Sequence, residues 1–132
     1  MVERELPEDV RRLIHTSVPS LDALELLIGL VRRAPAVMSL EMLHREVRSA
    51  GSSRESVQEY CRMLQAHGLI AEDPPGLYGY QPRSDELDRA VQGLLRAYNE
   101  RPVTLVRTVY DLADQRRIQA FSDAFRFKKE DR

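Results

Sequence analysis

The chain has 132 residues, of which 42% are hydrophobic and 31% are charged, and its formal net charge is −1. This composition is ordinary for a soluble globular domain and unlike that of a disordered or membrane-embedded chain. The near-neutral charge is a poor match to a nucleic-acid binder, in which a basic surface supplies most of the non-specific affinity. One cysteine and an N-terminus without an apolar leader favour a cytoplasmic protein.

Two helices are predicted in the first third of the chain. Pro7, followed by two acidic residues, starts a first helix that runs to about Thr16, within an N-terminal unit of residues 1–18. Ser20 is a good N-cap for a second helix over 20–33. Its apolar residues recur at helical spacing around most of the circumference, which predicts a central helix: Leu21, Leu24, Leu26, Leu27, Ile28, Leu30 and Val31.

A helix-turn-helix is predicted next. Ser39 caps a third helix over 39–49, and Ser52 with Glu55 forms the capping box of a fourth helix over 53–67. Gly68 is placed as the C-terminal stop of that helix. The predicted buried stripe of the fourth helix consists of Val57, Tyr60, Cys61 and Leu64.

The rest of the chain predicts a hairpin and further helices. "LIAE" and "LYGYQ" flank "DPPG", which predicts a short β-hairpin over 69–81. Ser84 starts another helix, and two separate helices follow after Pro102, the first around Leu105 and the last around Phe121. The expected fold is mainly α with a small β-hairpin: a winged helix-turn-helix over 19–82 with extra N- and C-terminal helices, the latter in a C-terminal extension over 83–132.

Residues 20–82 resemble the MarR-like winged-helix bacterial regulators. The segments that carry the resemblance are "SLDALELLIGLVRR", "SLEMLHREV", "SSRESVQEYCRMLQAHGLI" and "GLYGYQP". The resemblance implies a transcriptional regulator that binds double-stranded DNA through the helix at 53–67, and a homodimer built by terminal helices. It also implies DNA contacts at Ser39 and Ser52 at helix N-termini, at Arg54, Gln58 and Arg62 on base edges, and at a wing tip from Gly76 to Tyr78.

The charges favour an alternative, a winged helix that contacts protein and does not bind DNA directly. The predicted exposed face of the fourth helix carries Glu55 and Glu59, and the hairpin turn carries Glu72 and Asp73 without a base. Two carboxylates on the helix face would repel phosphates. We therefore regard Glu55 and Glu59 as candidate contacts for a protein partner.

The segment "RRIQAFSDAFRFKK" near the C-terminus is basic and amphipathic. Phe121 and Phe125 lie four residues apart, which places them on one helix face, and Arg126 follows them. The first interpretation is a helix that docks on its own core. The alternative is a dimer seam or a partner-docking helix, with the bases meeting an acidic partner or nucleic acid. A membrane-surface role is disfavoured because the helix has few bases and contains Asp123.

Catalytic and metal-binding motifs are not evident in the sequence. The three histidines are dispersed, without metal-ligand spacing to each other or to Cys61. Cys61 falls on the predicted buried stripe, which indicates an inert thiol more than a redox sensor. The sequence therefore predicts a binding protein without catalytic activity, metal or cofactor.

Overall fold

A computed structural model describes residues 6–47 and 52–130 of the chain. The elements are α1 (Glu8–Ser17), α2 (Leu21–Arg33), β1 (Met38–Ser39), α3 (Leu40–Glu46), α4 (Arg54–Ala66), β2 (Ile70–Glu72), β3 (Leu77–Tyr80), α5 (Asp85–Glu100) and α6 (Pro102–Glu130). The chain is therefore mainly helical with one small antiparallel sheet, as the sequence predicted. Residues 1–5, 48–51 and 131–132 lie outside the described residues, and so does the predicted end of the third helix at residue 49.

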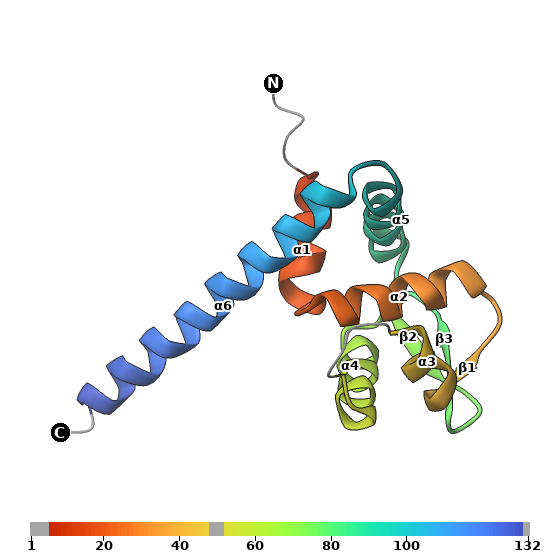
Figure 1. Cartoon of the computed structure of the whole chain (residues 1–132), viewed down its shortest axis with the longest axis horizontal. Coiled ribbons are helices and arrows are strands. Elements are labelled where there is room, and N and C mark those ends of the chain that lie inside the picture. Colours follow the sequence, from red (N-terminus) through yellow and green to blue (C-terminus); the bar gives the residue numbers. More distant parts are fainter. Residues whose placement is uncertain (1–5, 48–51, 131–132) are drawn as a thin grey trace.

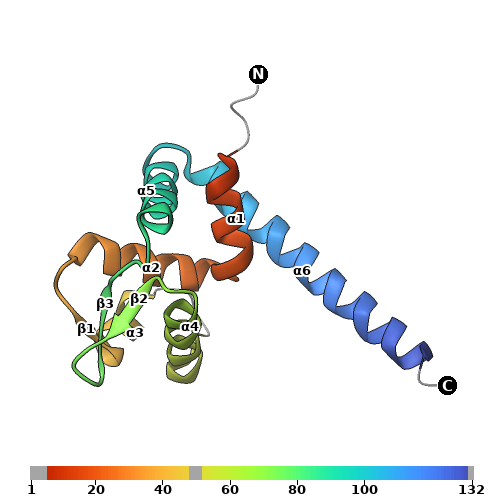
Figure 2. The same ribbon diagram turned by 180° about the vertical axis from the view of Figure 1, so that it is seen from behind.

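Helix α2 is the centre of the core. Its residues from Ala23 to Leu30 are buried except Glu25, which confirms the prediction of a central helix. Elements α3, α4 and the sheet lie on one side of α2, and α5 and the start of α6 lie on the other (Figure 1). This division separates α3, α4 and the sheet from the C-terminal helices, as the view from behind also shows (Figure 2).

Serine hydroxyls begin four of the helices. Ser20, Ser39 and Ser84 each accept a hydrogen bond from the backbone N–H three residues ahead, as their sequence positions predicted. The cap of α4 differs from the prediction. Ser53 holds the N-cap position and accepts from the N–H of Ser56 at 3.0 Å, whereas the hydroxyl of Ser52 donates to Asp22 on α2.

The sheet contains a strand that the sequence did not predict. Strands β2 and β3 form the expected hairpin, with Ile70 opposite Tyr80, and β3 also pairs with the two-residue strand β1, so that the order is β1-β3-β2. Two residues are too short for an alternating pattern to be recognised. The sheet is joined to α5 by the Tyr80 hydroxyl, which donates to Asp88 Oδ1 at 2.6 Å.

Helix α4 ends in a Schellman motif at Gly68. The N–H of Leu69 donates to the carbonyl of Leu64 and the N–H of Gly68 to that of Gln65, both at 3.0 Å. Gly68 has a φ of 77°, a conformation that glycine adopts without steric cost. Leu64 and Leu69 are both buried, which supplies the hydrophobic contact that accompanies this motif. The predicted stop is confirmed.

The last helix is continuous, and the prediction of two separate C-terminal helices was wrong. Residues 111–117, "DLADQRR", contain neither proline nor glycine and continue the helix. The first half of α6 packs on α1, α2 and α5, and Arg116 donates to the carbonyls of Ile14 and His15 at the end of α1. Beyond this point α6 leaves the body and projects outward (Figure 1).

Candidate functional site

The exposed face of α4 is the central feature of the candidate site. Residues Val57, Cys61 and Leu64 are fully buried, so the opposite side of the helix faces solvent. That exposed side carries Glu55 and Glu59, as predicted, together with the candidate base-reading residues Arg54, Gln58 and Arg62. The predicted orientation of α4 is confirmed, and its polar face carries two positive and two negative charges.

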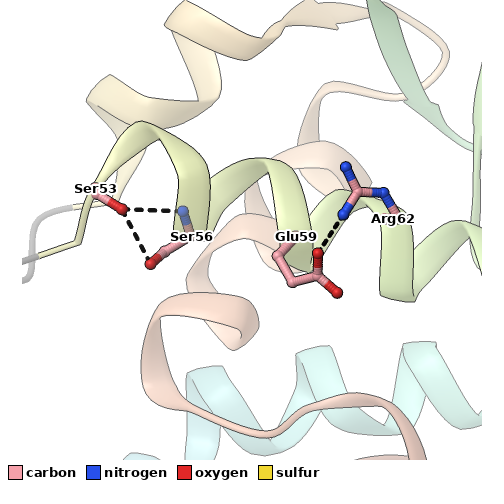
Figure 3. Close-up of polar contacts among 4 residues, drawn as sticks. All are labelled: Ser53, Ser56, Glu59 and Arg62. Atoms are coloured by element: carbon pink, nitrogen blue, oxygen red, sulfur yellow. Dashed lines mark hydrogen bonds and ion pairs between the residues drawn. The ribbon is translucent and has the colours of Figure 1, made fainter.

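Both arginines of this face are paired with carboxylates. Arg62 pairs with Glu59 one turn before it on the same helix, as Figure 3 shows, and Arg54 Nη2 lies 3.9 Å from Oε2 of Glu41 on α3. All four side chains are more than half exposed, so these pairs are weak and can open for another anion. Glu41 was not identified from the sequence, because a pair between two helices leaves no local spacing signal.

The serines selected as phosphate contacts hold structural positions. The Oγ of Ser39 accepts the N-cap hydrogen bond of α3 from the N–H of Met42. Ser52 is half-buried, and its hydroxyl donates to Asp22. Ser53 is exposed at the start of α4, where its Oγ also lies 3.1 Å from that of Ser56 (Figure 3). The serine at the solvent-facing end of α4 is thus the residue after the one predicted.

One of the two acidic residues at the hairpin turn has a structural role. Glu72 Oε2 accepts a hydrogen bond from the N–H of Gly76 at 2.8 Å, and Gly76 has a φ of 88°. The carboxylate therefore closes the turn from within the hairpin. Of the predicted wing tip, Gly76 is exposed, but Tyr78 is only 7% exposed and packs in the core because β3 is the central strand. The ring of Tyr78 is not part of the solvent-facing tip.

Cys61 has the environment of an inert thiol. Its side chain is fully buried on the inner face of α4, as predicted. Burial, and secondarily the negative charge of Glu72, raise the pKa of the Cys61 thiol to about 12. Because the thiolate is the reactive form, this site disfavours redox sensing in the folded protein.

A polar groove of about 640 Å³ lies between α2, α3 and α5 and was not predicted. The guanidinium of Arg32 stands 5.3 Å from the centre of the Tyr98 ring and donates to Asn99 Oδ1 at 2.8 Å. On the other wall Arg33 pairs with Glu46 of α3 at 2.9 Å. These contacts join residues far apart in the sequence and tie the end of α2 to both neighbouring helices.

The projecting half of α6 corrects the first interpretation of the C-terminal segment, which had the helix docked on its own core. Ile118 is 65% exposed and Phe121 is 74% exposed. The reason is geometric: a straight helix anchored at Arg116 passes the end of α1 and continues into solvent (Figure 2). Phe125 and Arg126 lie within α6, and their side chains are outside the described part of the structure.

Neither a metal-binding cluster nor a single helix that could cross a membrane is present among the described residues. Among residues 6–47 and 52–130, no cluster of three His, Cys, Asp or Glu side chains is arranged to hold a metal ion. In the same ranges no single helix is long and apolar enough to cross a membrane; α1 and α2 meet that criterion only as a pair, bent by 112°.

Comparisons with protein-family models, with curated proteins and with solved structures each gave no match for this chain.

Proposed function

We propose that the chain is a winged helix-turn-helix regulatory protein that binds double-stranded DNA through the exposed face of α4. The order α2–β1–α3–α4–β2–β3 and the strand order β1-β3-β2 support this fold assignment. In helix-turn-helix proteins the second helix enters the major groove, and here α4 is that helix. The exposed turn at Gly76 would be the wing.

The observation that carries the proposal is the alignment of three long polar side chains on α4. Arg54, Gln58 and Arg62 are spaced by four residues and are all exposed, so they lie along one side of the helix. Arginine and glutamine are the side chains that form bidentate hydrogen bonds with guanine and adenine edges in the major groove. Glu55 or Glu59 can accept from the amino group of cytosine.

The electrostatics of this face predict how such binding would behave. Two arginines and two glutamates cancel, and both arginines are already in ion pairs. Few phosphates would therefore be neutralised, so non-specific affinity is expected to be low and its dependence on salt shallow. Specific binding would rest on base contacts more than on backbone charge.

Fluorescence anisotropy of a labelled non-specific duplex at low salt tests the proposal. The chain should bind, and the double substitution Arg54→Ala, Arg62→Ala should weaken binding about tenfold or more, as expected for the loss of two charged contacts. Arg89→Ala with Arg96→Ala on α5 is the matched control, because it removes the same charge from exposed positions on the other side of α2. Absence of any binding at low salt would overturn the proposal.

A second function, protein recognition by the same face, is favoured by the pairing of both arginines with carboxylates. In that case Glu55 and Glu59 would meet basic groups of a partner, and DNA would not bind. The substitutions Glu55→Gln and Glu59→Gln separate the two functions. They should tighten non-specific DNA binding several-fold if α4 lies in the groove, since they remove phosphate repulsion. A protein-recognition module predicts no DNA binding by either form.

A further inference from the structure

A row of exposed side chains follows one side of α6 from the body into the projecting half. Tyr110, Asp114, Arg117 and Phe121 are separated by four, three and four residues, which places them within about 60° of one another around the helix. Tyr110 is 56% and Phe121 is 74% exposed, and the charged pair between them is more than 60% exposed. We call these four residues the α6 seam. The alternation of four and three is the spacing of helices that pair side by side.

We propose that the α6 seam pairs with the α6 seam of a second copy of this chain in antiparallel orientation. One register of such a pair brings Phe121 of one copy opposite Tyr110 of the other. The same register brings Asp114 of one copy opposite Arg117 of the other. Two-fold symmetry repeats each contact, so the pair contains two aromatic contacts and two ion pairs.

The charges of the seam select the antiparallel orientation. Asp114 and Arg117 lie on the same face, and within one chain Arg117 Nη1 already lies 3.0 Å from Asp114 Oδ1. A parallel in-register pair would set aspartate against aspartate and arginine against arginine. The antiparallel register sets opposite charges against each other at its centre, whereas like charges across an interface repel and oppose association.

The body of the protein offers a place for the incoming phenyl ring. An open notch of about 240 Å³ lies where the start of α2 meets α6. Tyr110 and Arg117 of the seam line it, together with the polar Ser20 and Asp22 and the apolar Pro19, Leu21, Val109 and Ala113. A cavity of roughly 150 Å³ is enough to hold a benzene ring. Phe121 of the same chain is eleven residues from Tyr110, about 16 Å along a continuous helix, and cannot fill the notch. In the antiparallel register Phe121 of the second copy lies over it.

Pairing through the α6 seam is independent of DNA binding. It gives residues and a register to the homodimer that the sequence led us to expect from the terminal helices. It also assigns a role to the projecting half of α6, which contributes no buried residue to its own core beyond Leu112 in the described part of the helix.

Sedimentation velocity over a range of concentrations tests the register through charge exchange. Asp114→Arg and Arg117→Glu should each weaken self-association more than tenfold, since each creates two like-charge contacts in the homodimer. An equimolar mixture of the two variants should regain the dimer, because both contacts then join opposite charges. The pair within one chain stays broken in both variants, so restoration in the mixture reports only contacts between copies.

Truncation of the aromatic contact provides a second measurement. Phe121→Ala should weaken the dimer more than tenfold, as truncation of a buried aromatic anchor does. Met42→Ala, at an exposed methionine of α3, is the control and should leave the dimer unchanged. A wild-type chain that stays monomeric at its highest soluble concentration would overturn the proposal. So would a dimer that withstands both single charge variants, or a mixture that fails to restore it.

Discussion

The hydroxyl of Tyr80 donates a 2.6 Å hydrogen bond to Asp88 Oδ1, and this bond joins the central strand of the sheet to α5. Asp88 also accepts from Gln92 Nε2 at 3.3 Å, so the carboxylate holds two donors. Burial, the hydrogen bond to Asp88 and its negative charge all raise the pKa of the Tyr80 phenol above its usual value. The folded state therefore favours the neutral, donating form of this side chain.

Tyr80→Phe should lower the free energy of unfolding by about 1.5–3 kcal/mol, the range for a hydrogen bond to a charged group. Urea denaturation monitored by circular dichroism measures this loss. Tyr60→Phe, at a half-buried tyrosine of α4, is the matched control and should change stability less. Equal midpoints for wild type and Tyr80→Phe would show that the bond contributes nothing to stability.

Glu72→Ala should loosen the hairpin turn, because the N–H of Gly76 loses its acceptor. The expected cost is about 1 kcal/mol, and it should appear locally as faster amide hydrogen exchange at Gly76. Asp73→Ala removes the same charge from the neighbouring residue and should leave that exchange rate nearly unchanged. If both substitutions accelerate the exchange of Gly76 equally, the turn responds to charge and not to this hydrogen bond.

Stability should fall with rising pH above about pH 9 because of Cys61. The folded pKa near 12 lies above the ordinary value of 9.0, so the unfolded chain loses the thiol proton first. The contribution of the protonated Cys61 thiol to the free energy of unfolding is fully present below pH 9.0. It is lost by about 1.4 kcal/mol per pH unit as the pH rises towards the pKa of the thiol in the folded protein. Denaturation curves of wild type and Cys61→Ala between about pH 8 and pH 10 measure this term. The variant should lose less stability over this interval; parallel curves would contradict the prediction.

Gly68→Ala should destabilise the protein by about 1–2 kcal/mol or more, because a Cβ is unfavourable at positive φ. That Cβ would also stand 2.7 Å from Nε of Arg83. Gly76→Ala is the matched control, since Gly76 has a similar φ of 88° with open space around it. The difference between the denaturation midpoints of Gly68→Ala and Gly76→Ala measures the contact with Arg83. This difference should shrink when both substitutions are made in an Arg83→Ala background.

Local signals explain the parts of the fold that could be predicted from the sequence. A serine three residues before its bonded amide, or a glycine after a helical stripe, acts within one turn of chain, so Ser20, Ser39, Ser84 and Gly68 could be recognised. The sequence does not show which of the neighbouring Ser52 and Ser53 is the N-cap of α4. Both precede α4, and the choice depends on Asp22, thirty residues earlier, which accepts from Ser52.

The less predictable parts depend on contacts between distant segments. Strand β1 exists because Met38 and Ser39 meet β3, and Tyr78 is buried because β3 is central. The pairing of Arg54 with Glu41 joins two helices. For the candidate site, the exposed residues of α4 followed from helical periodicity, but their pairing did not. The outward path of α6 is set by where α1 ends, which no feature of residues 115–124 encodes.

Because α6 is one continuous helix, a change in its length alters the orientation and position of its whole outer half. Leu112 is the last buried apolar residue among the described side chains of this helix. Inserting one residue between Leu112 and Phe121 would turn the outer half by about 100° and advance it by about 1.5 Å. The α6 residues beyond the insertion would then lie on a different side of the helix axis, although every residue of the body kept its position. By contrast, the exposed turn of the hairpin could absorb an extra residue locally. Genetic insertions in this chain should therefore be tolerated in the turn at residues 73–76 and harmful in the middle of α6.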